Sequence, residues 1–170
     1  MKRYAIVCES MTGNTAILAQ ALREHLRRTD VPILNPAAAS AEDYDVFFVG
    51  SWTDKGDCAA GTAAFLESLQ NKEIFLFGTC GFGGSDSYYD TVYRRFAAHV
   101  KPDNRINGHF ICQGKMPAQV LARFEAMKEA NPDASRWDEC IENYNRALTH
   151  PDGTDVQNLC CAVDQALEAV

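Results

Sequence analysis

The sequence of 170 residues has no long hydrophobic run. Its apolar stretches, such as residues 46–49, are far shorter than the ~18 residues that a membrane-spanning helix requires. The first three residues carry positive charge, but Glu9 and Ser10 interrupt the apolar residues that follow them. That apolar segment is too short for the core of an export signal. The sequence therefore predicts no transmembrane segment and no export, and we expect a cytoplasmic protein.

Paired cysteines are missing as well. The seven cysteines include no Cys-x-x-Cys spacing, and no two Cys or His residues have the spacing of a zinc finger. Cys160 and Cys161 are adjacent, but neighbours on a helix point to different sides and do not make a redox pair. Cysteines in a cytosolic chain are mostly reduced and buried as small apolar side chains. We therefore expect neither disulfides nor a metal site.

Positive charge is scarce, because 16 Lys and Arg residues face 23 Asp and Glu residues, for a formal net charge of −7. Non-specific binding to nucleic acid or to anionic membranes needs a basic face, so the net charge argues against both classes of partner, and we expect neither. The length and the 46% of hydrophobic residues are typical of one globular domain. We expect a single domain over residues 1–170, with a core at about 2–116 and a helical elaboration at about 117–170.

Short apolar runs alternate with amphipathic segments along the first two thirds of the chain. The runs lack period-two alternation, which is typical of strands that are buried on both faces. The expected strands are residues 3–8, 31–34, 46–50, 74–78 and 108–112. The expected helices between them are residues 16–28, 60–69 and 88–100. This alternation indicates an α/β fold, a doubly wound parallel sheet of five strands in the order 2-1-3-4-5.

Three more helices are expected after the fifth strand, at residues 118–130, 136–148 and 156–169. One of them must cover the sheet beside the first strand, and the others are an elaboration. Thr154 and Gln157 have the spacing of a capping box at the start of the last helix. The segment 112–116 is interpreted as a strand end that turns into a helix at Pro117, with a wall beside a ligand as the alternative.

Ligands of doubly wound sheets bind outside the carboxyl ends of the strands, where the strand order reverses. The loop after the first strand reads Ser10-Met11-Thr12-Gly13-Asn14-Thr15 and runs directly into a helix. Its hydroxyl and amide groups, with the free N–H groups and the dipole of the helix start, form a cradle for an anion. The loop is neither a Walker loop nor a dinucleotide-binding glycine motif. It suits a phosphate monoester held by neutral donors, and the alternative is an ordinary helix capped by Asn14 or Thr15.

Two further loops follow the third and fourth strands. The first, Ser51-Trp52-Thr53-Asp54-Lys55-Gly56, offers a flat indole ring for stacking on a planar ligand, unless the ring folds back onto the core. The second, Thr79-Cys80-Gly81-Phe82-Gly83-Gly84-Ser85, has glycines that allow a close approach of the backbone, and Tyr88 opens the next helix. Its alternative is a flexible loop with core aromatics. Together the three loops suit a flat heteroaromatic ligand with one terminal phosphate.

With these loops at three strand ends, the chain resembles the flavodoxin family over residues 2 to about 112. Ser10, Thr12, Gly13 and Thr15 match the fixed places of the family's phosphate loop, and Trp52 matches a Trp that often stacks on the flavin. The resemblance implies FMN as the cofactor. It places the following residues at the flavin: Ser10, Met11, Thr12, Gly13, Asn14, Thr15, Ser51, Trp52, Thr53, Asp54, Lys55, Gly56, Thr79, Cys80, Gly81, Phe82, Gly83, Gly84, Ser85 and Tyr88.

The sequence departs from the family at Thr53, where many members have Gly directly after the Trp. A β-branched residue resists positive φ, so the contact that this peptide makes to the flavin would come from another peptide. Lys55 near the ring would stabilise an anionic reduced flavin, but a solvated side chain is the favoured interpretation. In the third loop Phe82 is expected at the ring edge, with Tyr88 as the second choice.

The resemblance implies an electron carrier that passes electrons between redox partner proteins, a reductase and an acceptor enzyme. No catalytic side chain is assigned, and His109 and His150 have no evident partner. The acidic residues Asp54, Asp57, Asp86 and Asp90 are expected to border the cofactor and to steer basic partners. One alternative is an NAD(P)H-dependent flavin reductase of quinones or other small acceptors, with the added helices completing a cavity or an oligomer. Another is a flavin-free binding module.

Overall fold

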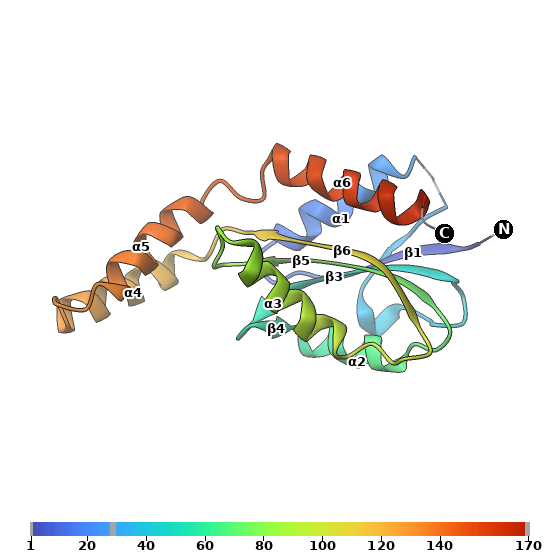
Figure 1. Ribbon diagram of the computed structural model, residues 1–170, viewed down its shortest axis with the longest axis horizontal. Helices are drawn as coiled ribbons and strands as arrows, with labels where there is room; N and C mark the ends of the chain where they lie inside the picture. Colours follow the sequence, from blue (N-terminus) through green and yellow to red (C-terminus); the bar gives the residue numbers. More distant parts are fainter. Residues whose placement is uncertain (1, 28–29, 169–170) are drawn as a thin grey trace.

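The computed structural model describes residues 2–27 and 30–168, and it contains one sheet with helices on both faces (Figure 1). Five parallel strands have the order β2-β1-β3-β5-β6, which confirms the doubly wound α/β topology predicted from the sequence. The strands are β1 (Tyr4–Glu9), β2 (Ile33–Leu34), β3 (Val46–Asp54), β4 (Asp57–Cys58), β5 (Glu73–Cys80) and β6 (Arg105–Gln113). The predicted count of five was wrong in one respect, because β4 is an additional strand that pairs antiparallel with β3.

The extra strand exists because β3 continues past the predicted end at Gly50. Asp54 pairs with Asp57 across a two-residue turn, in which Lys55 has φ 49° and Gly56 has φ 86°. Two central residues with positive φ are typical of a type I′ turn, whose twist matches that of the flanking strands. The segment predicted as a loop around Trp52 is therefore a β-hairpin, and Trp52 lies within β3.

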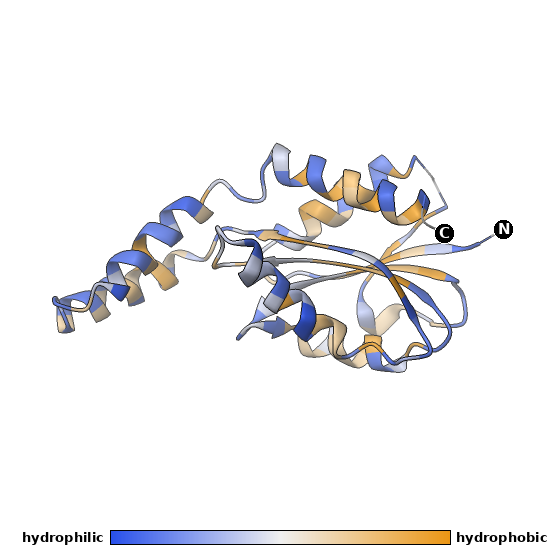
Figure 2. Ribbon diagram, in the orientation of Figure 1, coloured by the Kyte–Doolittle hydropathy of each residue, from blue (hydrophilic) through white to orange (hydrophobic). Residues whose placement is uncertain are grey.

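Helices cover both faces of the sheet (Figure 1). On one face lie α1 (Asn14–His25) and α6 (Gly153–Glu168), and on the other α2 (Ala60–Ser68) and α3 (Asp86–Ala97). Adjacent side chains of β3 are buried on opposite faces of the sheet. Phe47 packs toward Phe65 of α2, and Phe48 belongs to the apolar cluster that contains Leu159 of α6. The apolar residues gather between the sheet and these helices (Figure 2). The expectation that one C-terminal helix covers the sheet is met by α6, but this helix packs against β6, β5 and α1 rather than beside β1. None of the described helices has the length and apolar character needed to cross a bilayer.

The start of α6 differs from the sequence prediction. Oδ1 of Asp152 accepts hydrogen bonds from the N–H groups of Thr154 (2.8 Å) and Asp155 (2.9 Å). Oδ2 of Asp155 accepts in return from the N–H of Asp152 at 2.8 Å. This reciprocal pair is a capping box that begins two residues before the predicted one at Thr154. Asp155 also lies 2.6 Å from Nδ1 of His150, so His150 does have a carboxylate partner.

The remaining helices, α4 (Ala118–Ala130) and α5 (Arg136–Ala147), form a hairpin that projects beyond the sheet, and we call residues 118–147 the arm (Figure 1). The two helices pack against each other, with the ring centroids of Phe124 and Trp137 at 6.3 Å. No residue of α4 is buried. The two segments that connect the arm to the rest of the chain lie side by side, since the N–H of Lys115 donates to the carbonyl O of His150 at 2.9 Å.

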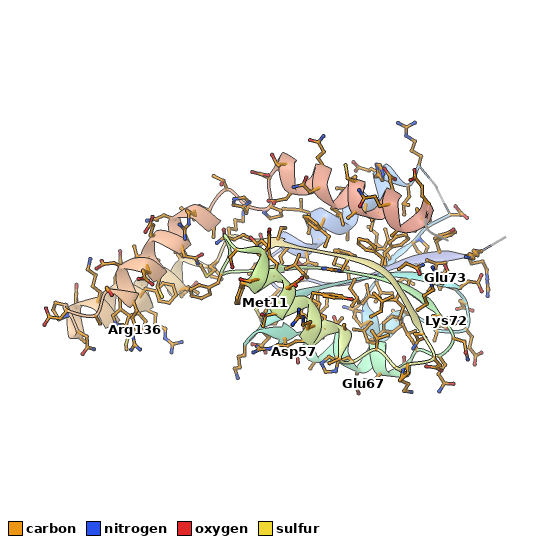
Figure 3. All side chains as sticks on the ribbon, in the orientation of Figure 1. Met11, Asp57, Glu67, Lys72, Glu73 and Arg136 are labelled. Atoms are coloured by element: carbon orange, nitrogen blue, oxygen red, sulfur yellow. The ribbon has the colours of Figure 1, made fainter. Side chains whose placement is uncertain are left out.

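The β4 hairpin is tied to α2 and α3 through His99. Nε2 of His99 lies 3.2 Å from Oδ2 of Asp57, and Nδ1 lies 2.8 Å from Oε1 of Glu67. The hydrogen bond to Glu67, assisted by Asp57, raises the pKa of His99 above its ordinary value of 6.5. Asp57 and Glu67 are both labelled in Figure 3, on the lower face of the sheet in that view.

We expect His99→Gln to cost more stability at low pH than at high pH. A raised folded pKa means that protonated His99 stabilises the fold below the unfolded pKa, and that this contribution is lost as pH rises through the folded value. His99 and its carboxylate partners are partly exposed, so the stability losses at low and high pH should differ by less than ~1 kcal/mol. Urea unfolding at about pH 5.5 and about pH 8.5 measures it.

His109→Gln is the control, because burial lowers the pKa of His109 and gives the opposite sign. The free-energy difference between wild type and His99→Gln should shrink as pH rises, and that for His109→Gln should grow. A constant difference for His99→Gln across this range would contradict the assigned protonation.

Candidate functional site

A cavity of about 410 Å³ lies at the carboxyl edge of the sheet, where β1 and β3 are neighbours. Its volume is within the range of small-molecule sites, ~300–1,000 Å³. Met11, labelled in Figure 3, lies at this edge, and Lys72 and Glu73 mark the opposite edge. A wider hollow of about 790 Å³ lies at the amino edge, between Arg23 and Tyr44, and none of the predicted site residues reaches it.

The cavity brings together the three loops predicted from the sequence, and each loop contributes one wall. The predicted residues that line it are Met11, Thr12, Asn14, Trp52, Thr53, Lys55, Gly56, Thr79, Cys80, Gly81, Phe82 and Tyr88. It also has a fourth wall, made by Gly114, Lys115, Met116 and Pro117 with Val120 of α4. The favoured interpretation of residues 112–116 as a mere strand end was therefore incomplete, because this segment lines the cavity before the arm begins.

Eight predicted residues do not line the cavity: Ser10, Gly13, Thr15, Ser51, Asp54, Gly83, Gly84 and Ser85. Most of them hold the lining residues in place. Buried Thr15 lies with its Oγ1 2.9 Å from Oγ1 of Thr79, and Ser85 caps α3 by accepting from the N–H of Tyr88 at 3.2 Å. Asp54 is the exception, since it is exposed on the β-hairpin.

The first loop turns into α1 at Gly13, whose φ of 93° is in the left-handed region. Oγ of Ser10 accepts from the N–H groups of Gly13 (3.1 Å) and Ala16 (3.3 Å). Ser10 thus stabilises the turn, and the alternative of a cap by Asn14 or Thr15 is wrong. The N–H groups of Asn14 and Thr15 have no hydrogen-bond partner within residues 2–27 and 30–168. These free donors, at the positive end of a helix dipole, suit an anion.

Asn14 joins the first loop to the fourth wall. Its buried Nδ2 donates to the carbonyl O of Lys115 at 2.9 Å and to Oγ1 of Thr12 at 3.2 Å. A Cβ on Gly114 would lie 2.6 Å from the same Nδ2, so only glycine allows this approach. Oδ1 of Asn14 is buried without a partner in the described part of the chain. A buried oxygen of this kind is costly unless a donor reaches it, and the adjoining cavity is where such a donor would bind.

The β-hairpin forms a second wall with one aromatic face. Trp52 is half-buried and pairs with Thr79 of the neighbouring strand. Oγ1 of Thr53 donates to the carbonyl O of Thr79 at 2.9 Å, which holds the hairpin against β5. Thr53 does not have a positive φ, in agreement with the sequence prediction, and the left-handed conformations fall on Lys55 and Gly56 instead.

The third wall follows β5 and carries both a thiol and aromatic rings. Sγ of Cys80 donates to the carbonyl O of Phe82 at 3.0 Å, and burial raises the pKa of Cys80 to about 12. Phe82 is 42% exposed and its ring centroid lies 6.3 Å from that of Phe124 in the arm. Tyr88 is half-buried, and desolvation raises its pKa. The thiol of Cys80 in this wall is therefore protonated at neutral pH.

The charge of the lining is opposite to that of the whole chain. Lys55 and Lys115 line the cavity, and no carboxylate does so within the described residues. None of the four acidic residues that were expected to border the site lines the cavity, and two have partners elsewhere: Asp57 is paired with His99, and Asp90 lies 3.5 Å from Arg94. In a chain of net charge −7, this contrast favours an anionic ligand.

A family model described as a flavodoxin domain matches residues 5–164, most of the chain. The chain belongs to the flavodoxin family. Two relatives bear the description flavodoxin-like domain-containing protein BilS. The one from Clostridium symbiosum is 36% identical over 91% of this chain and 90% of its own length. The one from Clostridioides difficile is 32% identical over 89% of this chain and 88% of its own length.

Solved flavodoxin structures share the fold at low sequence identity. Oxidised flavodoxin 2 from Bacillus cereus aligns with a TM-score of 0.61, 15% identity and 99% coverage of both chains. A flavodoxin variant from Fusobacterium nucleatum, solved with flavin mononucleotide bound, aligns with a TM-score of 0.55 and 14% identity over 99% of this chain and 97% of its own. At such identities the likeness concerns the fold.

The cysteines of this flavodoxin-family chain should differ sharply in reactivity. All seven are free thiols, Cys161 is exposed, and Cys80 is buried in the cavity wall. A thiol with a pKa of about 12 is ionised to roughly one part in ten thousand at about pH 8, and the thiolate is the reactive form. Limited alkylation of the native protein should therefore modify Cys161 first and leave Cys80 intact until unfolding. Peptide mass spectrometry measures this order, and early modification of Cys80 would contradict the described burial.

Proposed function

We propose that this protein binds FMN in the cavity and carries electrons between redox partner proteins, a reductase and an acceptor enzyme. The observation that carries the proposal is the convergence on one cavity of three kinds of group. These are the free N–H of Asn14 at the start of α1, the indole of Trp52, and two lysines with no carboxylate among the described residues of the lining. A flat, anionic phosphate ester matches all three.

The residues present fit this cofactor. The N–H of Asn14 with the hydroxyl of Thr12 would hold the phosphate, and the unpartnered Oδ1 of Asn14 would accept from a ligand hydroxyl. Trp52 and Tyr88 would supply aromatic surface for the ring system. FMN, when bound, supplies one- and two-electron transfer.

The residues of the chain would bind the cofactor, orient it and shield it. Lys55 and Lys115 balance the negative charge of a phosphate ester, while the neutral thiol of Cys80 cannot attack the ring system as a thiolate. Met11 is 69% exposed and Phe82 42% exposed, and both stand at the mouth of the cavity. They offer an apolar rim against which a partner protein can dock. No general acid or base is required for this role.

An alternative is an NAD(P)H-dependent flavin reductase of quinones or other small acceptors. One observation favours it, because Pro117 and Val120 extend the cavity wall onto the arm and so provide apolar surface beyond the three loops. Steady-state oxidation of NADPH by the FMN-loaded protein, without a separate reductase, would select this alternative. Reduction that requires a separate flavoprotein reductase would select the carrier.

The proposal is tested by titrating the flavin-stripped protein with FMN and with riboflavin, and following the quenching of flavin fluorescence. FMN should bind much more tightly than riboflavin, because only FMN carries the phosphate. Lys115→Glu should weaken FMN binding and leave riboflavin binding unchanged, whereas Lys101→Glu, an exposed charge reversal away from the cavity, should change neither. Absence of quenching in folded protein would overturn the proposal in favour of a flavin-free binding module.

A further inference from the structure

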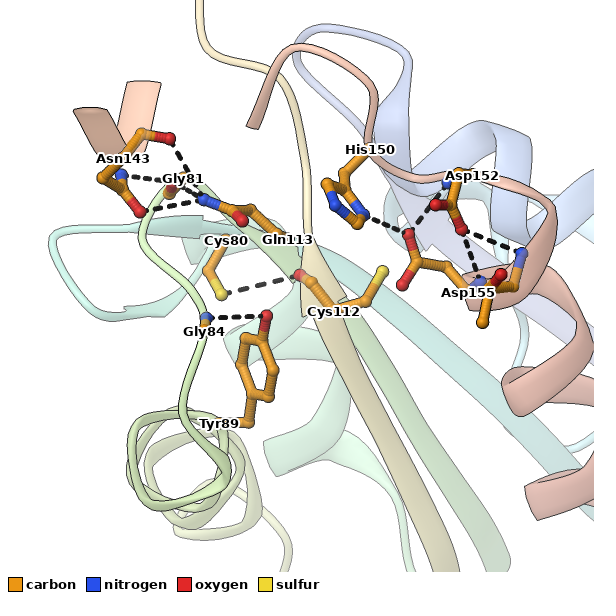
Figure 4. A network of polar contacts seen from close by, with 11 residues as sticks. Cys80, Gly81, Gly84, Tyr89, Cys112, Gln113, Asn143, His150, Asp152 and Asp155 are labelled. Carbon is orange, nitrogen blue, oxygen red and sulfur yellow. Dashed lines mark hydrogen bonds and ion pairs between the residues drawn. The ribbon is translucent and has the colours of Figure 1, made fainter. Parts of the chain in front are cut away.

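A buried amide pair joins the arm to the cavity (Figure 4). Asn143 of α5 and Gln113 at the end of β6 are 4% and 5% exposed. Nδ2 of Asn143 and Nε2 of Gln113 both donate to the carbonyl O of Gly81, each at 3.0 Å. Two side chains from distant parts of the chain thus hold one backbone carbonyl in the third wall of the cavity.

The side-chain oxygen of Asn143 also has two hydrogen-bond partners. Its Oδ1 accepts from Nε2 of Gln113 at 2.9 Å and from the N–H of Gly83 at 3.3 Å. The next N–H, that of Gly84, donates to Oη of Tyr89 at 3.3 Å. The segment 81–84 has no regular secondary structure, so these side chains take the place of a backbone ladder.

The position of Asn143 has a consequence for the site. Gly81 and Phe82 line the cavity, and Asn143 binds the backbone on both sides of Phe82 without lining the cavity itself. A Cβ on Gly83 would lie 2.8 Å from Cδ of Gln113, so the segment is packed directly onto the amide pair. The geometry leaves the 81–84 backbone little freedom while Asn143 is in place.

We propose that Asn143 is a positioning residue that fixes segment 81–84 against the cofactor, so that the arm is a structural part of the flavin site. This inference rests on the proposed binding of FMN. The chemistry requires an amide at position 143, because a carboxylate would place an acceptor beside the carbonyl O of Gly81. An apolar side chain would leave the N–H of Gly83 without its acceptor and the carbonyl O of Gly81 with Gln113 as its side-chain donor.

The test compares Asn143→Leu with Asn145→Leu, a matched change at an exposed position of the same helix. In the flavin-free proteins, amide hydrogen exchange of segment 81–84 should be faster in Asn143→Leu only. FMN affinity should fall about tenfold in Asn143→Leu, as expected for the loss of one to two net hydrogen bonds. At saturating FMN, its visible absorption spectrum and midpoint potential should shift, which a general loss of stability would not produce.

A second readout uses the reciprocity of coupling between two sites. Addition of FMN to wild type should slow exchange in α5 around residue 143, and this protection should be absent in Asn143→Leu. Unchanged exchange in segment 81–84 together with wild-type affinity, spectrum and potential would overturn the inference. If wild type itself fails to bind FMN, the proposed function falls, while exchange of segment 81–84 in the flavin-free proteins still decides whether Asn143 positions it.

Discussion

Replacing Trp52 with alanine is expected to weaken FMN binding by about 10- to 100-fold. Stacking of a heteroaromatic ring on an aromatic side chain contributes ~1–3 kcal/mol, and each 1.4 kcal/mol corresponds to about tenfold in affinity. Trp52 is half-buried in the cavity wall and lies on a strand that Thr53 fastens to β5, so the backbone that carries the ring is held in place before the ligand arrives. Fluorescence titration of the flavin-stripped variant measures the loss.

The pattern of loss identifies the role of the ring. Trp52→Ala should weaken FMN and riboflavin equally, because the indole would contact the part that the two ligands share. Thr12→Ala, in the phosphate cradle, should weaken FMN alone. Trp52→Phe should retain most of the affinity. A loss confined to FMN in Trp52→Ala, or a loss below about twofold, would show that the indole is not a stacking surface.

Replacing Gly50 with alanine is expected to lower the free energy of unfolding by about 3 kcal/mol, at the upper end of the usual range for overpacking. A Cβ at this position would lie 2.2 Å from Cζ of Phe77, which is fully buried in the neighbouring strand. Gly50 and Phe77 are paired in register between β3 and β5, two central strands, so neither backbone can move aside easily. Urea unfolding measures the change.

Gly153→Ala is the matched control, because nothing lies within 4 Å of a Cβ there and the residue begins α6. It should leave stability unchanged or raise it by about 0.5–1 kcal/mol. In the double variant Gly50→Ala/Phe77→Leu the two losses should not add, since the smaller side chain removes the clash. A loss of less than about 0.5 kcal/mol in Gly50→Ala would show that the ring relocates without strain.

The sequence was sufficient to predict the sheet and three of the four cavity walls. The strand order follows from apolar runs that are local in the chain, and the loops at their carboxyl ends carry residues of distinctive chemistry. The extension of β3 could not be found in this way, because residues 51–54 are mostly polar and pair through backbone atoms. The position of the α6 cap was likewise ambiguous, since both Asp152 and Thr154 begin a stretch with capping-box spacing.

The fourth wall and the role of Asn143 depend on contacts that no local pattern encodes. Asn14 meets Lys115 across 101 residues of sequence, and Asn143 meets Gly81 across 62. Each contact is one amide on one backbone carbonyl, and an amide side chain on a helix has no periodicity that distinguishes it from a solvent-exposed one. The close approach of Gly114 to Asn14 is similarly invisible until the fold brings both together.

The chain leaves the core at Lys115 and returns at His150, and a hydrogen bond of 2.9 Å already joins these two residues. The helical hairpin between them is therefore an insertion whose two junctions are adjacent. Another hairpin could replace it without a change in the order or the connections of the strands. This makes the arm a natural point for grafting a foreign helical module. Any replacement that keeps an amide at the place of Asn143 should also keep the third wall of the cavity intact.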